Sequence, residues 1–235
     1  MASSVPILLV PGLLCSARLY APQIPALWPY GPVTVVDHRR DADMAAIAAR
    51  ILNEAPPRFA LAGLSMGGYI AFAMLRLAPE RIARLALLDT SARPDTPEQT
   101  AGRKTQIAMA QADRFGEIPE LSIPRFLHRN RQHDERLTAI VRQMAEETGP
   151  DAFVRQQNAI MTRPDSRPLL ASIACPTLVL VGDGDEATPP ELNREIAGGI
   201  SGAKLVVVPD CGHLSTLEKP EAVNAALADW LTFKN

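Results

Sequence analysis

The sequence contains few cysteines, no excess of charge and no long apolar run. Its three cysteines, Cys15, Cys175 and Cys211, lie far apart without a CxxC pair, which argues for reduced thiols rather than a disulfide framework or a zinc site. The formal net charge of the 235 residues is −2, so the charge balance indicates neither nucleic acid nor an anionic membrane as a partner. The first apolar run breaks at Pro11-Gly12, too short for a secretory signal or a membrane-spanning helix. We therefore expect a cytoplasmic enzyme or binding protein.

Short runs rich in Leu and Val alternate along the chain with longer Ala-rich stretches of helical pattern. This alternation predicts parallel strands joined by helical crossovers. Because the strand candidates are nearly all apolar, we expect them to be buried on both faces of a sheet. Strands are expected at 7–10, 33–37, 59–62, 85–88, 177–181 and 205–208, and helices near 44–53, 66–77, 190–196 and 222–231.

The alternation is interrupted between residues 91 and 167. This region has no convincing strand, and its charged helical stretches are punctuated by prolines, among them Pro97, Pro119 and Pro164. We expect a helical insertion, or lid, at 91–168, between two parts of one core domain at 1–90 and 169–235.

A serine within the sequence GLSMGG, residues 63–68, follows one predicted strand and opens a predicted helix. On such a sharp strand-to-helix turn a serine is strained and exposed, as a catalytic nucleophile requires. Side chains two residues before and after Ser65 would clash there, so Gly63 and Gly67 are expected to make room. The helix N-terminus leaves the Met66 N–H free for a developing oxyanion. The alternative is a serine N-cap on an ordinary helix.

A nucleophilic serine needs a base, and the chain has four histidines. His213 follows the last predicted strand, which places it at the same edge of the sheet as Ser65. For His38, His128 and His133 we expect solvated or structural roles. A metal site at His38 and its neighbouring aspartates lacks a fixed ligand spacing, so a charged surface loop is the preferred interpretation.

The acid that would orient the base has three candidates on the pattern alone. Asp183 and Asp185 follow the fifth predicted strand, and Asp89 ends the fourth. An Asp-Gly turn accounts well for Asp183. Each choice gives the chain order Ser, Asp, His, which is the order of one particular fold.

Several motifs in this order resemble the α/β-hydrolase superfamily over nearly the whole chain. ILLVPGLLCSARLY looks like its first strand and oxyanion loop, LAGLSMGGYIAF like its nucleophile elbow, and VVVPDCGHLSTLEKPEAV like its G-H loop and last helix. In the family's G-x-x-D-x-x-x-P loop, here GDGDEATP, the functional acid is the fourth residue, so the resemblance implies Asp185 rather than Asp183. It also implies a mostly parallel sheet with helices on both faces and a lid inserted before the acid strand.

The oxyanion loop departs from the family. Members commonly have His-Gly where this chain has Pro11-Gly12, and the resemblance implies that the Leu13 N–H joins that of Met66 in binding the oxyanion. The family's usual leading hairpin is also missing, so a shorter sheet is expected at one edge.

The resemblance implies a serine hydrolase that cleaves a small carboxylic ester or thioester through an acyl-enzyme on Ser65. His213 would be the base and Asp185 its orienter, with no cofactor or metal required. The size and the lid are similar to small carboxylesterases, such as the pimeloyl-carrier-protein methyl ester esterases, and to the triad lyase of menaquinone synthesis. The alternatives are a lyase or carbon–carbon bond reaction with the same triad, and a ligand-binding receptor, which the complete triad disfavours.

The lid is expected to select the substrate. Candidate binding residues are Arg125, Arg129, Phe126 and Phe153. Apolar lid side chains could line an acyl site, but such residues more often pack the lid against the core. The arginines could receive a carboxylate or the phosphate of a carrier protein, and the alternative is a solvated helix surface.

Overall fold

The computed structural model describes residues 5–233, so the predictions for residues 1–4 and 234–235 lie outside the described residues. Six strands form one sheet in the order β2-β1-β3-β4-β5-β6, and all neighbouring strands are parallel. The strands are β1 (Ile7–Val10), β2 (Val33–Val35), β3 (Phe59–Leu64), β4 (Ile82–Leu88), β5 (Thr177–Gly182) and β6 (Lys204–Val208). From β1 the chain pairs first with β2 on one side and then with β3 on the other. Loops that follow β1 and β3 therefore meet at the point where the strand order reverses, which is where open parallel sheets bind ligands.

The four central strands are buried along most of their length, but the two edge strands are not. In β2 the residues are half-buried or exposed, and in β6 Leu205 and Val207 are exposed. The expectation that all strands are buried on both faces is therefore wrong for β2 and β6. Each of them has a neighbouring strand on one side only, so an apolar sequence does not by itself bury it.

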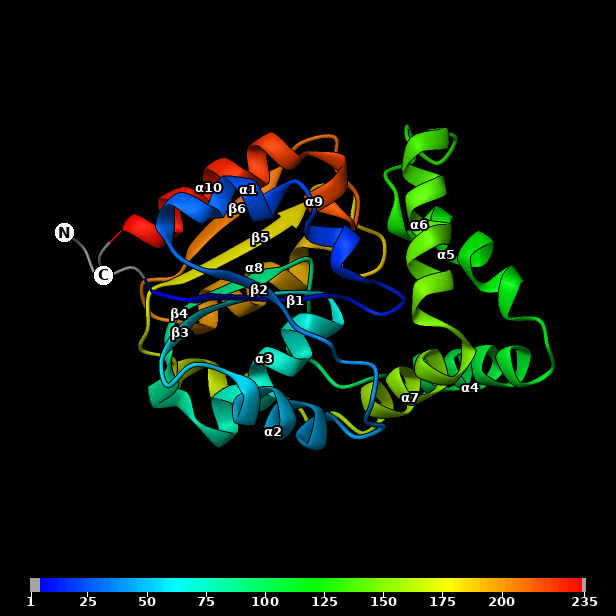
Figure 1. The fold of residues 1–235 in the computed structure, drawn as a ribbon, viewed down its shortest axis with the longest axis horizontal. Helices are drawn as coiled ribbons and strands as arrows, with labels where there is room; N and C mark the ends of the chain where they lie inside the picture. The colour runs from blue at the N-terminus through cyan, green and yellow to red at the C-terminus, as the bar shows by residue number, and fades with distance from the viewer. Residues whose placement is uncertain (1–4, 234–235) are drawn as a thin grey trace.

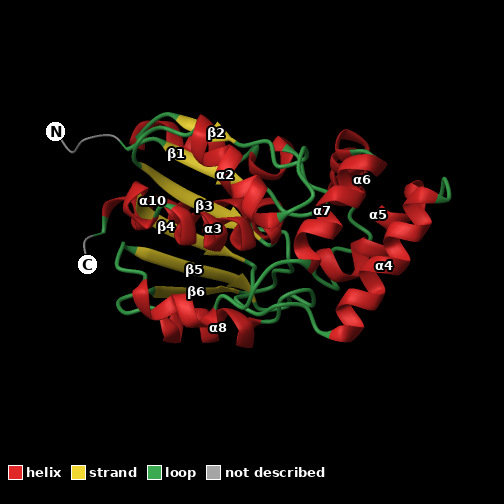
Figure 2. Ribbon diagram, turned by 90° about the horizontal axis from the view of Figure 1, so that it is seen from below, coloured by secondary structure: helices red, strands yellow, loops and turns green. Residues whose placement is uncertain are grey.

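Helices cover both faces of the sheet (Figures 1 and 2). One face carries α2 (Met44–Glu54), α3 (Met66–Leu77) and α8 (Pro190–Gly199), and the other carries α1 (Gln23–Leu27) and α10 (Pro220–Thr232), with the short α9 (Ser215–Glu218) just before α10. Local sequence sets several of their ends. The Asp43 side chain accepts a hydrogen bond from the Ala46 N–H at the start of α2, and Pro220 opens α10, where its missing N–H costs nothing. No helix within residues 5–233 is long and apolar enough to cross a membrane.

Between β4 and β5 the chain forms four further α-helices beyond the carboxyl ends of the strands (Figure 2), together with two short 3-10 helices at Phe115–Glu117 and Arg167–Ser172. They are α4 (Pro97–Gln111), α5 (Ile118–Phe126), α6 (Glu135–Thr148) and α7 (Pro150–Met161), and we call them the lid. A capping box between Thr96 and Gln99 begins α4, and the Asp134 carboxylate caps α6. The lid therefore covers the sheet edge at which the serine, acid and histidine loops lie.

Candidate active site

Ser65 lies between β3 and α3 with backbone angles φ 55° and ψ −114°. A positive φ is unfavourable for a residue with a side chain, so the surrounding structure must hold it. The Ser65 N–H donates to Leu88 O (3.0 Å), and its carbonyl accepts from Gly68 N (2.9 Å) and Thr90 Oγ1 (2.8 Å). The side chain lines a cavity of about 460 Å³, and within residues 5–233 its hydroxyl has no hydrogen-bond partner.

The two glycines of the elbow are required for close backbone contacts. A Cβ at Gly63 would lie 2.3 Å from Gly67 O, as expected for residues that face each other across the turn. A Cβ at Gly67 would instead lie 2.0 Å from Val10 O, at the end of β1. Gly67 therefore makes room for the strand that leads into the oxyanion loop, a contact that no local sequence pattern predicts.

His213 and Asp185 are brought together beside this cavity. His213 Nδ1 lies 2.8 Å from Asp185 Oδ2, and both side chains are buried. Asp185 follows β5, and its Oδ1 also accepts from the backbone N–H groups of Ala187 (2.8 Å) and Thr188 (2.9 Å). The Thr188 hydroxyl donates to Asp185 Oδ2 (2.8 Å), a contact that no motif in the sequence predicted. These three donors hold the carboxylate in the orientation in which Oδ2 faces the imidazole.

Within the described residues, neither of the other two candidate acids forms a hydrogen bond or an ion pair with His213. Asp183 is exposed, and its Oδ1 accepts from Cys211 N (3.2 Å). Asp89 is fully buried, and it accepts from Gly182 N (3.0 Å) and from the Ser215 hydroxyl (2.5 Å). Burial, together with the nearby Asp185 carboxylate, raises the pKa of Asp89 well above its usual value. Asp89 thus ties the ends of β4, β5 and the His213 loop together.

The loop after β1 carries Leu13, which lines the cavity. In this loop the Leu14 N–H donates to Gln156 Oε1 (3.2 Å) and the Cys15 N–H to Gly12 O (3.2 Å). The Leu13 N–H has no acceptor within the described residues, and Met66, as the first residue of α3, has no intrahelical acceptor for its N–H. Two unused backbone donors therefore flank Ser65.

His38 contacts the loop after β1 at Gly12. Its Nε2 lies 3.0 Å from Gly12 O and 3.1 Å from Gln156 Nε2. Since one ring nitrogen either donates or accepts, only one of these contacts is a hydrogen bond at a time. Burial lowers the pKa of His38 to about 4, so the ring is neutral near pH 7.

The charged surface loop expected around His38 is therefore wrong for His38 itself, which is buried. Two neighbouring carboxylates are paired with arginines, Asp37 with Arg39 (2.8 Å) and Asp41 with Arg50 (2.6 Å), and Asp43 caps α2. No cluster of potential metal ligands occurs in the described part of the chain. Neither His38 nor Gln156 carried a local signal, because their contacts join residues far apart in the sequence: Gly12 and His38 are 26 positions apart, and Gln156 is more than a hundred positions from both Leu14 and His38.

The predicted lid residues separate into two groups. Arg125 and Phe126 line the cavity, and the Phe126 ring lies 5.5 Å from the His213 ring. Arg129 is exposed and outside the lining, whereas Phe153 is fully buried inside the lid, 5.7 Å from the Phe115 ring. Phe153 therefore packs the lid and does not reach the cavity.

The remaining histidines and the cysteines take structural or solvated positions. His128 is buried, and a Cβ at Gly184, in the acid loop, would meet its ring at 2.3 Å; His133 is exposed. All three cysteines are free. Burial raises the pKa of the Cys15 thiol, close to the site, to about 12, so it stays protonated.

Comparison with known proteins places the chain in a hydrolase family. The pattern of the alpha/beta hydrolase family matches residues 7–226. A pimeloyl-[acyl-carrier protein] methyl ester esterase of Neisseria meningitidis is 27% identical over 221 residues, 89% of this chain and 85% of that protein. A putative non-heme bromoperoxidase of Mycobacterium tuberculosis is 29% identical over 198 residues, 79% of this chain and 71% of that protein. Among solved structures, a malate-bound thermophilic esterase of Thermogutta terrifontis has a TM-score of 0.87 and 34% identity, covering 97% of this chain and 89% of that one.

Proposed function

Because the chain belongs to the alpha/beta hydrolase family, we propose that it is a serine hydrolase that cleaves a small carboxylic ester or thioester. One observation carries the proposal. Ser65, at positive φ, lines the same cavity as His213, and His213 Nδ1 faces the buried carboxylate of Asp185. This arrangement supports Ser65 as nucleophile, His213 as base and Asp185 as orienter in acyl transfer through a serine.

In the proposed reaction His213 removes the proton of Ser65 as the hydroxyl attacks the ester carbonyl. Asp185 Oδ2 accepts from Nδ1–H, which leaves a lone pair on Nε2 to take that proton. The carboxylate also stabilises the imidazolium that forms. His213 then protonates the leaving alcohol or thiol, and a water molecule, activated by the same ring, releases the acyl group from Ser65.

The negative charge that develops on the carbonyl oxygen is met by the N–H groups of Leu13 and Met66. Both are free backbone donors, and the N-terminus of α3 adds a favourable field. Each such donor typically contributes about 10²–10³ in kcat. The loop that carries Leu13 is held by Gln156 of the lid and by His38 of the core.

The relatives support ester chemistry without identifying the substrate. The Thermogutta protein is named as an esterase, and the Neisseria protein as a methyl ester esterase. A carrier-protein partner remains a prediction. Two arginines of the basic lid segment are committed to other partners, Arg131 to Asp210 O and Arg142 to Glu120.

The proposal is tested with a fluorophosphonate probe and nitrophenyl esters. Wild-type protein should become labelled and turn over the esters, whereas Ser65→Ala should lose labelling and about three orders of magnitude or more in kcat. Ser91→Ala is the matched control, because Ser91 lines the same cavity and contacts no residue of the triad. It should keep both properties.

Two results would contradict the proposal. If the wild type neither reacts with the probe nor hydrolyses any ester, the acyl-enzyme hypothesis fails. If it is labelled at Ser65 but turns over no ester or thioester, the lyase or carbon–carbon bond reaction becomes the better interpretation.

A further inference from the structure

The cavity beside Ser65 is rich in arginine. Four line it, Arg93, Arg103, Arg125 and Arg163, and within the described residues Glu98 is the one carboxylate among the lining side chains. Arg93 is neutralised by Glu195, with Nε–Oε2 and Nη2–Oε1 distances of 2.9 and 3.0 Å. The other three arginines, Arg103, Arg125 and Arg163, outnumber the carboxylates near them, which are Asp95 and Glu98.

Asp95, behind the cavity wall, is shared by two of these arginines. Arg103 Nε lies 2.6 Å from Asp95 Oδ2, and Arg163 Nη1 lies 2.7 Å from Asp95 Oδ1. The Asp95 side chain is 2% exposed and that of Arg163 is 7% exposed. One buried carboxylate therefore faces two guanidinium groups, which leaves a positive charge in a poorly solvated position. Such a charge is costly unless another anion pairs with it.

Arg163 has one donor group left for that anion. Its Nε donates to Arg93 O (3.1 Å), and its Nη1 donates to Asp95 and to Ile160 O (2.9 Å). Nη2 has no acceptor among residues 5–233, although the side chain lines the cavity. The guanidinium carbon lies 4.2 Å from the centre of the Tyr69 ring, which also lines the cavity and holds the group in place.

Arg125 adds a second unpaired positive charge from the lid. It lies near the C-terminal end of α5, next to Phe126, and its side chain forms no ion pair or hydrogen bond within the described part of the chain. Arg125 and Arg163 reach the same cavity from different elements. The free Nη2 group of Arg163 and the unpaired guanidinium of Arg125, in the same cavity as Ser65, are suited to bind a carboxylate.

We propose that the substrate carries a carboxylate in addition to the ester or thioester that Ser65 attacks, and that Arg163 and Arg125 bind this second group. The proposal rests on the proposed hydrolase function. The preferred substrates are then half-esters of small dicarboxylic acids, or esters of other acids that keep one free carboxylate. The cavity, of about 460 Å³, suits a molecule of this size.

The first test compares substrates that differ only in this charge. Monomethyl succinate, glutarate and adipate are assayed beside the same esters with the free acid replaced by a primary amide, which has nearly the same shape without charge. For the preferred length, kcat/KM should be at least about tenfold higher for the acid, the usual effect of a charge-assisted hydrogen bond. Equal values for acid and amide at every length would overturn the proposal.

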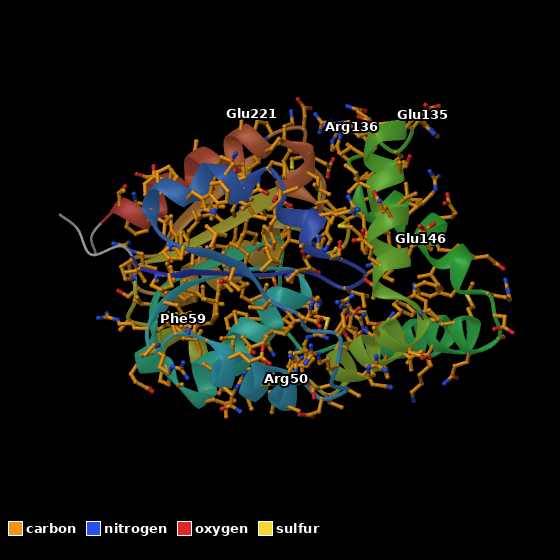
Figure 3. All side chains as sticks on the ribbon, viewed as in Figure 1. Arg50, Phe59, Glu135, Arg136, Glu146 and Glu221 are labelled. Atoms are coloured by element: carbon orange, nitrogen blue, oxygen red, sulfur yellow. The ribbon has the colours of Figure 1, made fainter. Side chains whose placement is uncertain are left out.

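The second test removes each arginine and follows the acid-to-amide ratio. Arg163→Gln and Arg125→Met should each lower the ratio severalfold or more. Arg136→Met is the matched control, because Arg136 is also an exposed, unpaired lid arginine but lies at the start of α6, outside the cavity lining (Figure 3). It should leave the ratio unchanged. Since Arg163 also supports Asp95, the exposed Arg125 provides the variant that is expected to fold normally.

A binding measurement separates this proposal from the proposed function. Calorimetry with glutarate on Ser65→Ala protein needs no catalysis, and binding that is lost in Ser65→Ala/Arg125→Met supports the anion site by itself. If nitrophenyl esters are hydrolysed through Ser65 but acids are neither preferred nor bound, the anion site is wrong and the hydrolase proposal stands. If glutarate binds but no ester is turned over, the hydrolase proposal is wrong.

Discussion

The carboxylate of Asp185 is the most heavily bonded group of the site. It accepts from two backbone N–H groups and from the Thr188 hydroxyl before it meets His213 Nδ1. These three donors fix the plane of the carboxylate and keep Oδ2 toward the ring. The position of the imidazole is therefore set by the loop 183–189 and not by the histidine alone.

The replacement Asp185→Asn should lower kcat by about three to four orders of magnitude on nitrophenyl esters. An amide at this position can direct a donor at Nδ1, which would place the ring proton on Nε2 and remove the base. Asp183→Asn is the matched control in the same loop. Its side-chain oxygen can still accept from Cys211 N, so turnover should change less than about threefold. A larger loss for Asp183→Asn than for Asp185→Asn would refute the assignment of the acid.

At single residues, the sequence was most informative where a motif is local. Ser65 and His213 were predicted from the strands and helices that flank them, and the structure places both at one cavity. Asp185 was separated from Asp183 by resemblance to a family loop. Gln156 and His38 were not predicted, because their contacts with the oxyanion loop depend on how the lid packs on the core, and no short pattern reports that.

Between elements, α3 lies close to the end of β1 at Gly67. Gly67 has no side chain to separate them, and a Cβ at this position would lie only 2.0 Å from Val10 O. The oxyanion loop starts one residue after Val10. The first turn of α3 therefore sets how close that loop lies to Ser65.

Gly67→Ala should lower the free energy of unfolding by about 1–3 kcal/mol and reduce ester turnover, because β1 or α3 must move to admit the methyl group. Gly198→Ala is the control. This residue lies in α8, and a Cβ there meets no atom within 4 Å. It should be neutral or stabilise the protein by up to about 1 kcal/mol, since alanine is the better helix former. Urea unfolding measures both changes, and equal effects at the two positions would exclude steric contact as the cause.

Elements with a clear pattern were predicted within a few residues. The expected strands at 7–10 and 177–181 are β1 and β5, and the helix at 66–77 is α3. The segment 17–30 was not assigned, and it forms two short 3-10 helices and α1. These pieces are too short for helical periodicity to appear in the sequence, and Pro22, Pro25 and Pro29 interrupt them.

In the molecule as a whole, the lid is bonded to the core at the catalytic loops. Phe126 O, at the end of α5, accepts from the N–H groups of both His213 (3.0 Å) and Leu214 (3.1 Å). Gln156 of α7 reaches Leu14 N and His38. Glu218 accepts from His128 N in the lid (2.9 Å) and from Gly212 N in the core (3.1 Å). Lid packing and the geometry of the site are therefore parts of one structure.

Buried His38 makes this structure sensitive to acid. Its pKa is about 4 in the folded protein and near 6.5 when unfolded, so between these values the unfolded chain binds one more proton. The contribution of His38 to the free energy of unfolding should be fully present above about pH 6.5. It should fall by about 3 kcal/mol in total as the pH drops towards 4. The charged groups near the ring are Asp37, Arg39 and Arg50.

Urea unfolding of wild type and His38→Asn at several pH values between 4 and 7.5 measures this contribution. The difference in unfolding free energy between the two proteins should shrink as the pH falls, because asparagine does not titrate. His133→Asn, at an exposed position, should keep the wild-type slope. A constant difference across the range would show that His38 titrates alike in the folded and unfolded states.

At this scale the fold prediction is confirmed: the chain has the α/β-hydrolase fold, with a mostly parallel sheet, helices on both faces and a helical lid before the acid strand. Several ordered motifs along one chain determine a topology better than any one element does. The division at 91–168 stays a prediction about domains. The hydrogen bonds of Phe126, Gln156 and Glu218 cross that boundary, and no pattern in the lid sequence predicts them.

The hydrogen bonds from the His213 loop to Phe126 O affect how freely the lid sequence can diverge in evolution. The acceptor is a main-chain carbonyl, so any residue at position 126 supplies it as long as α5 ends there. Side chains along the lid can therefore be exchanged to admit new substrates while the base stays in place. A lid grafted from a relative should preserve catalysis if the end of its helix is kept in register with His213 and a glutamine at position 156 still accepts from the Leu14 N–H.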